Sequence, residues 1–200
     1  MLDKKLQTIQ TYNQSAKALA DKFDALGARV SDIEETFALI NKENPKVLEI
    51  GCGNGRDAEV ILKRTNDYVG IDISEELILL AKKKVPEAKF EVVDVVSFDF
   101  PSSLDIVFAF ASLIHITKEE FRLVLSKLLT SLNKEGVVRI SLKNSPEYEE
   151  VTEESEFGVR TYYYYSQEDI VEVATGFEIV KSEVLEKGAT RWLEVILRKS

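Results

Sequence analysis

The sequence has one cysteine in 200 residues, which excludes an intramolecular disulfide. A reducing setting, and with it a cytoplasmic location, is expected on that ground. No apolar run approaches the length of a membrane span, and the first ten residues carry charge where a secretion signal would be apolar. The sequence therefore predicts neither a signal peptide nor a membrane partner.

Negative charge outnumbers positive charge. There are 26 Lys and Arg against 35 Asp and Glu, so the net charge is -9. An acidic surface repels phosphate backbones, and nucleic acid is therefore not expected as a partner. The remaining composition is that of an ordinary globular protein, and the length fits a single domain, residues 1–200, without internal repeats. The composition indicates no particular oligomeric state.

Two helices are predicted before residue 45. In the first, apolar residues recur at three- and four-residue steps, and Gly27 ends it. These apolar residues are Leu2, Leu6, Ile9, Ala16, Leu19, Phe23 and Leu26. The second helix is predicted from a capping box, Ser31 with Glu34, and stops before Pro45. Residues 1–44 are thus expected to form an N-terminal helical segment.

From residue 46 the pattern alternates between strands and helices. Strands are predicted at 46–50, 67–72, 89–95, 104–110 and 136–143, with helices between them at 58–62, 74–84 and 117–132. This alternation favours a parallel sheet with helices on both faces. The last segment, 177–199, reads as two strands without a helix between them, which must be antiparallel. We therefore predict a doubly wound α/β fold with a mostly parallel seven-stranded sheet.

Residues 144–165 break this rhythm. The segment is acidic and has no apolar period, and we interpret it as a lid or substrate insert ending in a short strand. A helix follows it, with Ser166 and Asp169 as its capping box.

The stretch "VLEIGCGNGRD", residues 47–57, places Gly51, Gly53 and Gly55 between a strand and a helix. Glycine leaves the backbone bare for a close ligand and adopts positive φ readily. Loops of this kind bind nucleotide-like ligands at the carboxyl edge of open α/β sheets. A tight turn without a ligand is the alternative.

Acids end the next two strands. Asp72 follows Gly55 by seventeen residues and is placed to accept both hydroxyls of a ribose. It could instead cap the next helix, although Ser74 is available for that role. Asp94 ends the third strand, where a carboxylate can accept from an adenine amino group.

These residues resemble the class I S-adenosylmethionine-dependent methyltransferases, over residue 12 to the C-terminus. Glu49-x-Gly51-x-Gly53-x-Gly55 matches the family's first motif, and "GIDIS" and "VVDV" are similar to the next two. The resemblance implies S-adenosylmethionine as cofactor and S-adenosylhomocysteine as product. It implies a cofactor site formed by Tyr12, Glu49, Gly51, Cys52, Gly53, Asn54, Gly55, Asp57, Asp72, Ile73, Asp94, Val95, Phe110 and Ala111.

Three other functions stay open. A nicotinamide-dependent oxidoreductase shares the strand, loop and ribose acid, but its G-x-G-x-x-G spacing is not met because position 56 is arginine. Non-catalytic nucleotide binding and methylation of a protein are the others. We expect methylation of a small-molecule acceptor by direct in-line transfer, with no metal site.

Candidate residues for the chemistry are few. His115, the only histidine, follows the fourth strand and is a general base, a donor that orients the acceptor, or a packing residue. Lys143, Arg160, Tyr163 and Tyr165 are candidates for contacting the acceptor. Cys52 lies near a helix N-terminus, which would lower its pKa, but a small residue tolerated in a tight loop is the more natural interpretation.

Overall fold

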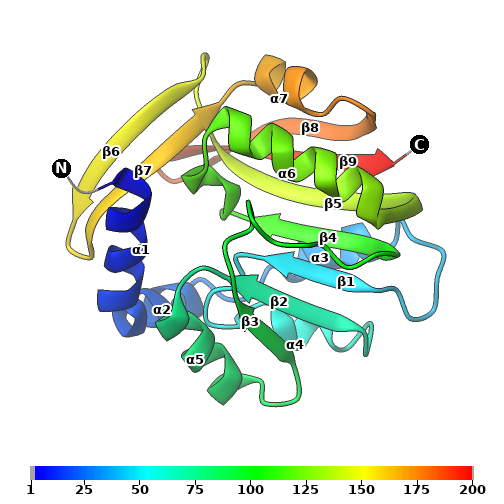
Figure 1. The fold of residues 1–200 in the computed structure, drawn as a ribbon, viewed down its shortest axis with the longest axis horizontal. Coiled ribbons are helices and arrows are strands. Elements are labelled where there is room, and N and C mark those ends of the chain that lie inside the picture. The colour runs from blue at the N-terminus through cyan, green and yellow to red at the C-terminus, as the bar shows by residue number, and fades with distance from the viewer. Residues whose placement is uncertain (1–2, 200) are drawn as a thin grey trace.

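A computed structural model describes residues 3–199 and contains a nine-stranded sheet (Figure 1). The parallel part follows the order β3-β2-β1-β4-β5 and continues through the antiparallel strands β9 and β8. The bounds are β1 (Val47–Ile50), β2 (Tyr68–Asp72), β3 (Lys89–Val92), β4 (Leu104–Phe110), β5 (Leu132–Asn144), β8 (Phe177–Lys187) and β9 (Thr190–Lys199). These seven strands confirm the predicted doubly wound sheet and its terminal hairpin.

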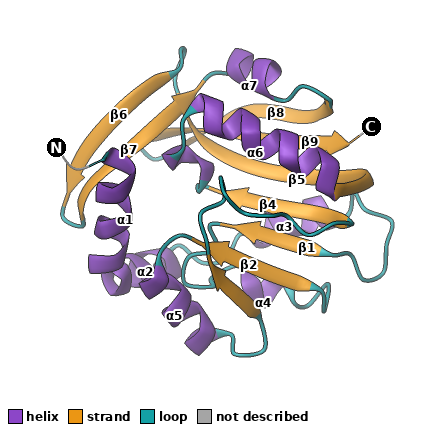
Figure 2. Ribbon diagram, in the orientation of Figure 1, coloured by secondary structure: helices purple, strands orange, loops and turns teal. Residues whose placement is uncertain are grey.

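Helices cover both faces of this sheet (Figure 2). On one face, α6 (Lys118–Ser131) and α7 (Gln167–Val173) bury Phe121 and Ile170 against alternate residues of the central strands. On the other, α3 (Val30–Phe37), α4 (Ala58–Ile61) and α5 (Glu75–Lys84) form a second apolar cluster. Successive residues of β4 belong to different clusters, Val107 to the first and Phe108 to the second, as side chains of a strand must.

The predicted capping boxes of α6 and α7 are both present, Thr117 with Glu120 and Ser166 with Asp169. The first predicted helix is instead two, α1 (Lys4–Gln14) and α2 (Ala16–Ala25), which meet at Ser15; Leu2 lies outside the described residues.

The box predicted at Ser31 is wrong. Residue 31 lies inside α3, whose N-cap is Arg29. The Arg29 backbone N–H donates to Asp57 at 2.8 Å, so the start of α3 is set by a contact between distant segments.

The insert 144–165 contains a β-hairpin, β6 (Glu149–Ser155) and β7 (Gly158–Tyr165), in which β7 confirms the predicted short strand and β6 was not predicted. Two residues of β5 pair with β7, and Lys143 among them also pairs with β9. Strand β9 lies along one edge of β5 and β4 along the other. Strand β7 therefore lies on the same edge of β5 as β4, beyond the point where β4 ends. The exposed acids of β6 conceal the strand alternation in the sequence.

Helix α1 holds the hairpin in place (Figure 1). Thr11 Oγ1 donates to the Val159 carbonyl at 2.6 Å, and Ser15 Oγ donates to the Phe157 carbonyl at 2.7 Å.

Within residues 3–199, no helix combines the length and apolar character that crossing a membrane requires.

The cap of α6 follows His115 by two residues, so it also fixes the end of the segment that carries the histidine. Replacing Thr117 with Ala removes the bond to the Glu120 N–H and should lower the free energy of unfolding by about 1 kcal/mol. Urea denaturation measures this loss. Thr130→Ala, at an exposed position of the same helix, is the matched control and should change stability by less than about 0.5 kcal/mol. Equal effects of the two variants would show that the cap contributes nothing specific.

Candidate functional site

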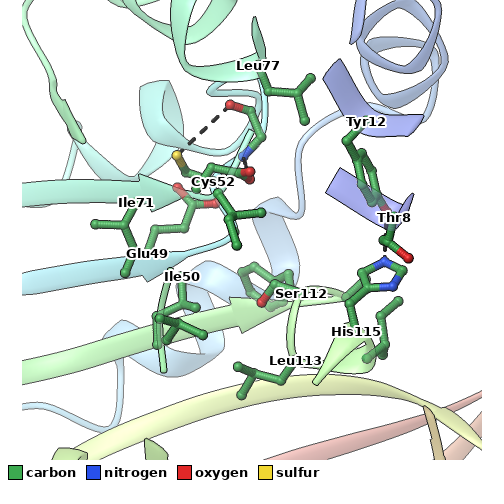
Figure 3. Close-up of a pocket in the computed structure, with 18 of the residues that line it drawn as sticks. Thr8, Tyr12, Glu49, Ile50, Cys52, Ile71, Leu77, Ser112, Leu113 and His115 are labelled. Carbon is green, nitrogen blue, oxygen red and sulfur yellow. Dashed lines mark hydrogen bonds between the residues drawn. The ribbon is translucent and has the colours of Figure 1, made fainter. Parts of the chain in front are cut away.

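A cavity of about 310 Å³ lies at the carboxyl ends of β1, β2 and β4 and reaches α1 and β7 (Figure 3). Its volume is in the range of small-molecule and cofactor sites. Of the predicted cofactor and catalytic residues, all but Gly55 line it. Gly55 lies beneath the loop instead, where a Cβ would come within 3.3 Å of Ala81 and Phe90.

The glycine loop brings the ends of β1, β2 and β4 together. Gly51 has φ 71°, and a Cβ there would lie 2.1 Å from the Ser112 Cβ, so only glycine permits this approach. Gly53 has φ 56° and faces open space, with no atom within 4 Å of an added Cβ. The loop therefore presents bare backbone to the cavity.

The Asp72 carboxylate is held by backbone amides. Gly53 N–H donates to Oδ2 at 2.9 Å and Ser74 N–H donates to Oδ1 at 2.8 Å. Burial raises the pKa of Asp72, and these amide donors oppose the rise. Each carboxylate oxygen keeps a second lone pair for a ligand. Ser74 is the N-cap of α5, so Asp72 is not needed for that role.

Asp94 lies at the same edge and binds Lys5 of α1. Its Oδ1 accepts from the Val96 N–H at 3.0 Å, and Lys5 Nζ is 2.6 Å from Oδ2. Burial lowers the pKa of Lys5, but the bonds to Asp94 and Glu120 outweigh it and the net shift is upward. Lys5 was not predicted, because no sequence motif connects the first helix to the third strand.

Two other acids of the motif are enclosed by protein. Glu49 accepts from Tyr68 Oη at 2.5 Å, and burial, together with Asp57 and Asp72, raises its pKa well above the usual range. Asp57 accepts from the side chains of Arg29 and Arg56, each at 2.8 Å. Asp57 therefore joins α3 to the glycine loop, and the two arginines, which the sequence did not indicate, line the cavity with it.

Cys52 is buried in the loop (Figure 3). Burial raises the pKa of its thiol well above the usual value, and Asp72 and Glu49 raise it further. The expectation of a lowered pKa is wrong, since burial dominates and α4 is a helix of only four residues. A protonated thiol is a poor nucleophile, which fits a packing role.

His115 lies in a single 3₁₀ turn, η1 (Leu113–His115), with both ring nitrogens hydrogen-bonded (Figure 3). Nδ1 is 2.7 Å from the Thr161 carbonyl oxygen and Nε2 is 2.8 Å from Tyr12 Oη. A carbonyl only accepts, so Nδ1 carries the proton and Nε2 accepts from the tyrosine. Burial lowers the pKa of His115 to about 4, and the imidazole is neutral at physiological pH.

Tyr163 and Tyr165, predicted as candidates for contacting the acceptor, do not line the cavity. Tyr162 lines the cavity, with its ring centroid 4.8 Å from that of His115. Tyr163 stacks on Tyr148 and faces a smaller, neighbouring cavity, while Tyr165 is fully buried and donates to the Ile116 carbonyl. The pairing of β7 with β5 at Tyr164 and Tyr165 determines which face of β7 lies toward the cavity, and Tyr162 is on that face. The sequence does not indicate this register.

Three residues complete this end of the cavity. Lys143 and Arg160, both predicted, line it together with Trp192 of β9, which was not. Trp192 pairs directly with Lys143 across the sheet, a contact that depends on the antiparallel register of β5 and β9.

The contact between Gly51 and Ser112 leads to a stability prediction. Gly51→Ala adds a clash to the cost of a left-handed conformation and should destabilise the protein by about 3 kcal/mol. Gly27 has a similar φ of 73° with open space around it, so Gly27→Ala should cost only about 1 kcal/mol. Adding Ser112→Gly to Gly51→Ala should restore part of the free energy of unfolding that Gly51→Ala loses, as measured by urea denaturation. No recovery would mean that the approach of these residues is not the constraint.

The lowered pKa of His115 leads to a pH-dependence prediction. The folded value of about 4 is below the ordinary 6.5, so between these values the unfolded chain binds the proton and the folded chain does not. The stabilisation that the neutral His115 contributes is complete above the pKa of the imidazole in the unfolded chain. It is lost as the pH falls toward the pKa of the imidazole in the folded chain. The free energy of unfolding should therefore drop more from about pH 7 to about pH 5 in the parent than in His115→Gln. Identical pH dependence would contradict the burial of a neutral imidazole.

Comparisons with known proteins agree with this geometry. A family described as a methyltransferase domain matches residues 47–136. A Bacillus cereus protein named an uncharacterized methyltransferase is 29% identical over 130 residues, which cover 64% of this chain and 60% of that protein. The chain thus matches less than two thirds of the length of these relatives.

Solved structures show the same fold. A 1,6-didemethyltoxoflavin-N1-methyltransferase of Burkholderia thailandensis superposes with a TM-score of 0.72 at 18% identity, covering 100% of this chain and 92% of that one. An S-adenosylmethionine-dependent methyltransferase of Clostridium acetobutylicum gives a TM-score of 0.73 at 13% identity, covering 94% and 99%. Residues 47–136 thus match a methyltransferase domain, and the solved structures share the fold of the chain.

Proposed function

We propose that this protein binds S-adenosylmethionine in the cavity and methylates a small-molecule acceptor. The observation that carries the proposal is the convergence of the glycine loop, Asp72 and Asp94 on one cavity. Asp72 would accept from the ribose hydroxyls, and Asp94 would accept from the adenine amino group in place of Lys5. Gly53 would leave room for the ligand beside the loop.

The residues fit a ligand of this kind in a further respect. Ser112 Oγ is buried and, within residues 3–199, has no hydrogen-bond partner, although it belongs to a residue that lines the cavity. A buried hydroxyl without a partner costs free energy, which a polar ligand atom would offset. The hydroxyl adjoins the glycine loop through the contact with Gly51.

When bound, S-adenosylmethionine supplies a sulfonium methyl group, whose transfer returns the bond's electron pair to sulfur and leaves S-adenosylhomocysteine. The protein's part is to align the acceptor and exclude water. Helix α1 and hairpin β6–β7 would enclose the acceptor, with Tyr12 and Tyr162 at its sides. The enclosed acceptor would then attack the methyl group in line with its bond to sulfur.

The Tyr12–His115 pair would receive the acceptor's proton. The neutral Nε2 of His115 accepts a hydrogen bond from Tyr12 Oη. Tyr12 Oη can therefore take the proton of the acceptor while it passes its own proton to Nε2. A base with a pKa of about 4 is weak, but methylation makes the attacking nitrogen or oxygen strongly acidic. A weak base that is always unprotonated therefore suffices at neutral pH.

Two structural neighbours support a small acceptor. The Burkholderia enzyme was solved with 1,6-didemethyltoxoflavin and S-adenosylhomocysteine bound, and a magnesium protoporphyrin IX methyltransferase of Synechocystis gives a TM-score of 0.65 at 17% identity. Both named acceptors are small molecules.

Thermal denaturation with S-adenosylhomocysteine tests the proposal. At a ligand concentration of about 100 times Kd, the folded state should gain about 2.7 kcal/mol, which appears as a raised Tm. Asp72→Asn should abolish most of the shift, whereas Asp21→Asn, on the exposed side of α2, should leave it unchanged. NAD should give no shift. A shift with NAD alone would contradict the proposal and favour a nicotinamide cofactor.

A further inference from the structure

We propose that the acceptor is an aromatic acid whose anionic group binds Arg160 at the hairpin end of the cavity. This inference rests on the proposed function and specifies the substrate class of the same site. It combines the surroundings of Arg160, the local balance of charge and the aromatic lining.

Arg160 projects from β7 among aromatic rings and lines the cavity. Its guanidinium carbon lies 5.5 Å from the centroid of the Tyr12 ring, 5.4 Å from that of Tyr162 and 5.8 Å from that of Phe157. No carboxylate of the described part of the chain comes within ion-pair distance of it. The rings hold the guanidinium in place. Its Nη2 donates to Ser155 Oγ at 3.5 Å, which leaves other N–H donors of the fork for a planar anion.

The local charge leaves this cation uncompensated. Glu153 is the residue opposite Arg160 in the hairpin register. Its carboxylate instead accepts from Lys143 Nζ at 3.1 Å and from Tyr164 Oη at 2.9 Å. Two cations thus share one acid, and His115 is neutral. In a chain of net charge -9, a positive subsite of this kind is a specific feature that a bound anion would balance.

The surrounding surface is aromatic. Lys143 Nζ lies 3.5 Å from the centroid of the Tyr162 ring, and the same ring is in contact with His115. Trp192 lines the cavity beside Lys143. Flat π faces next to a guanidinium match a planar ring that bears a carboxylate. An acceptor held this way would also lie beside the Tyr12–His115 pair.

The cofactor's own carboxylate is the competing occupant of Arg160. The cavity offers that group other cations, Arg29 and Arg56, at the glycine loop. Both already contact Asp57, so they neutralise an acid of the loop as well as facing the ligand. The experiment must therefore measure the cofactor product and the acceptor separately.

The test uses the full chain saturated with S-adenosylhomocysteine and two probes of nearly equal shape, benzoate and benzamide. Ligand-observed NMR titration should show a Kd for benzoate about tenfold lower than for benzamide, as a charge-assisted hydrogen bond predicts. Arg160→Gln should remove this preference and Arg160→Lys should keep part of it. Arg191→Gln, at an exposed position of β9, is the matched control and should leave it intact. The Kd of S-adenosylhomocysteine should be the same in all four proteins.

Two outcomes would overturn the inference and leave the proposed function standing. One is that the saturated parent binds benzoate no better than benzamide, or binds neither. The other is that Arg160→Gln weakens S-adenosylhomocysteine itself, which would assign the guanidinium to the cofactor's carboxylate. Failure of the parent to bind S-adenosylhomocysteine would instead overturn the proposed function, and this inference with it.

Discussion

The close approach of Gly51 to Ser112 is the constraint on which the site depends. It brings the end of β1 against the segment that follows β4, where a Cβ would lie 2.1 Å from a neighbouring Cβ. The next turn of the loop then places the Gly53 N–H on Asp72 at the end of β2. Three strand ends are thereby joined around one cavity without large side chains. The same geometry leaves the Ser112 hydroxyl buried and, among the residues that the structure describes, without a partner, so it is available to a ligand.

The other half of the cavity depends on contacts between segments that are distant in sequence. Helix α1 is held to β7 by a hydrogen bond from the Thr11 side chain to the backbone carbonyl of Val159. The helix thereby brings Tyr12 to His115 and Lys5 to Asp94. The histidine is neutral because protein surrounds it, and Thr161 sets its tautomer. Position, protonation state and hydrogen bonding of the candidate base thus all follow from docking α1 and the hairpin on the sheet. The Lys5–Asp94 ion pair also links α1 directly to the region proposed for adenine.

The sequence allows local features to be predicted better than contacts between elements. The glycine loop, the acids Asp72 and Asp94, two capping boxes and the terminal hairpin follow from short patterns, because each obeys a local rule of periodicity or backbone conformation. Strand β6 was missed since its acids are exposed, so no apolar alternation exists to detect. Tyr163 and Tyr165 were predicted at the acceptor in place of Tyr162, because which face of a strand lies toward the cavity depends on its pairing partner. Lys5, Arg29 and Trp192 reach the cavity only through tertiary packing.

The most direct test of the central claim is a crystal structure of the protein grown with S-adenosylhomocysteine. Binding at the glycine loop predicts both ribose hydroxyls within hydrogen-bond distance of the Asp72 carboxylate, the adenine amino group on Asp94, and Lys5 displaced from that acid. A ligand found elsewhere, or one at the loop with Asp72 making no contact to the ribose, would contradict it.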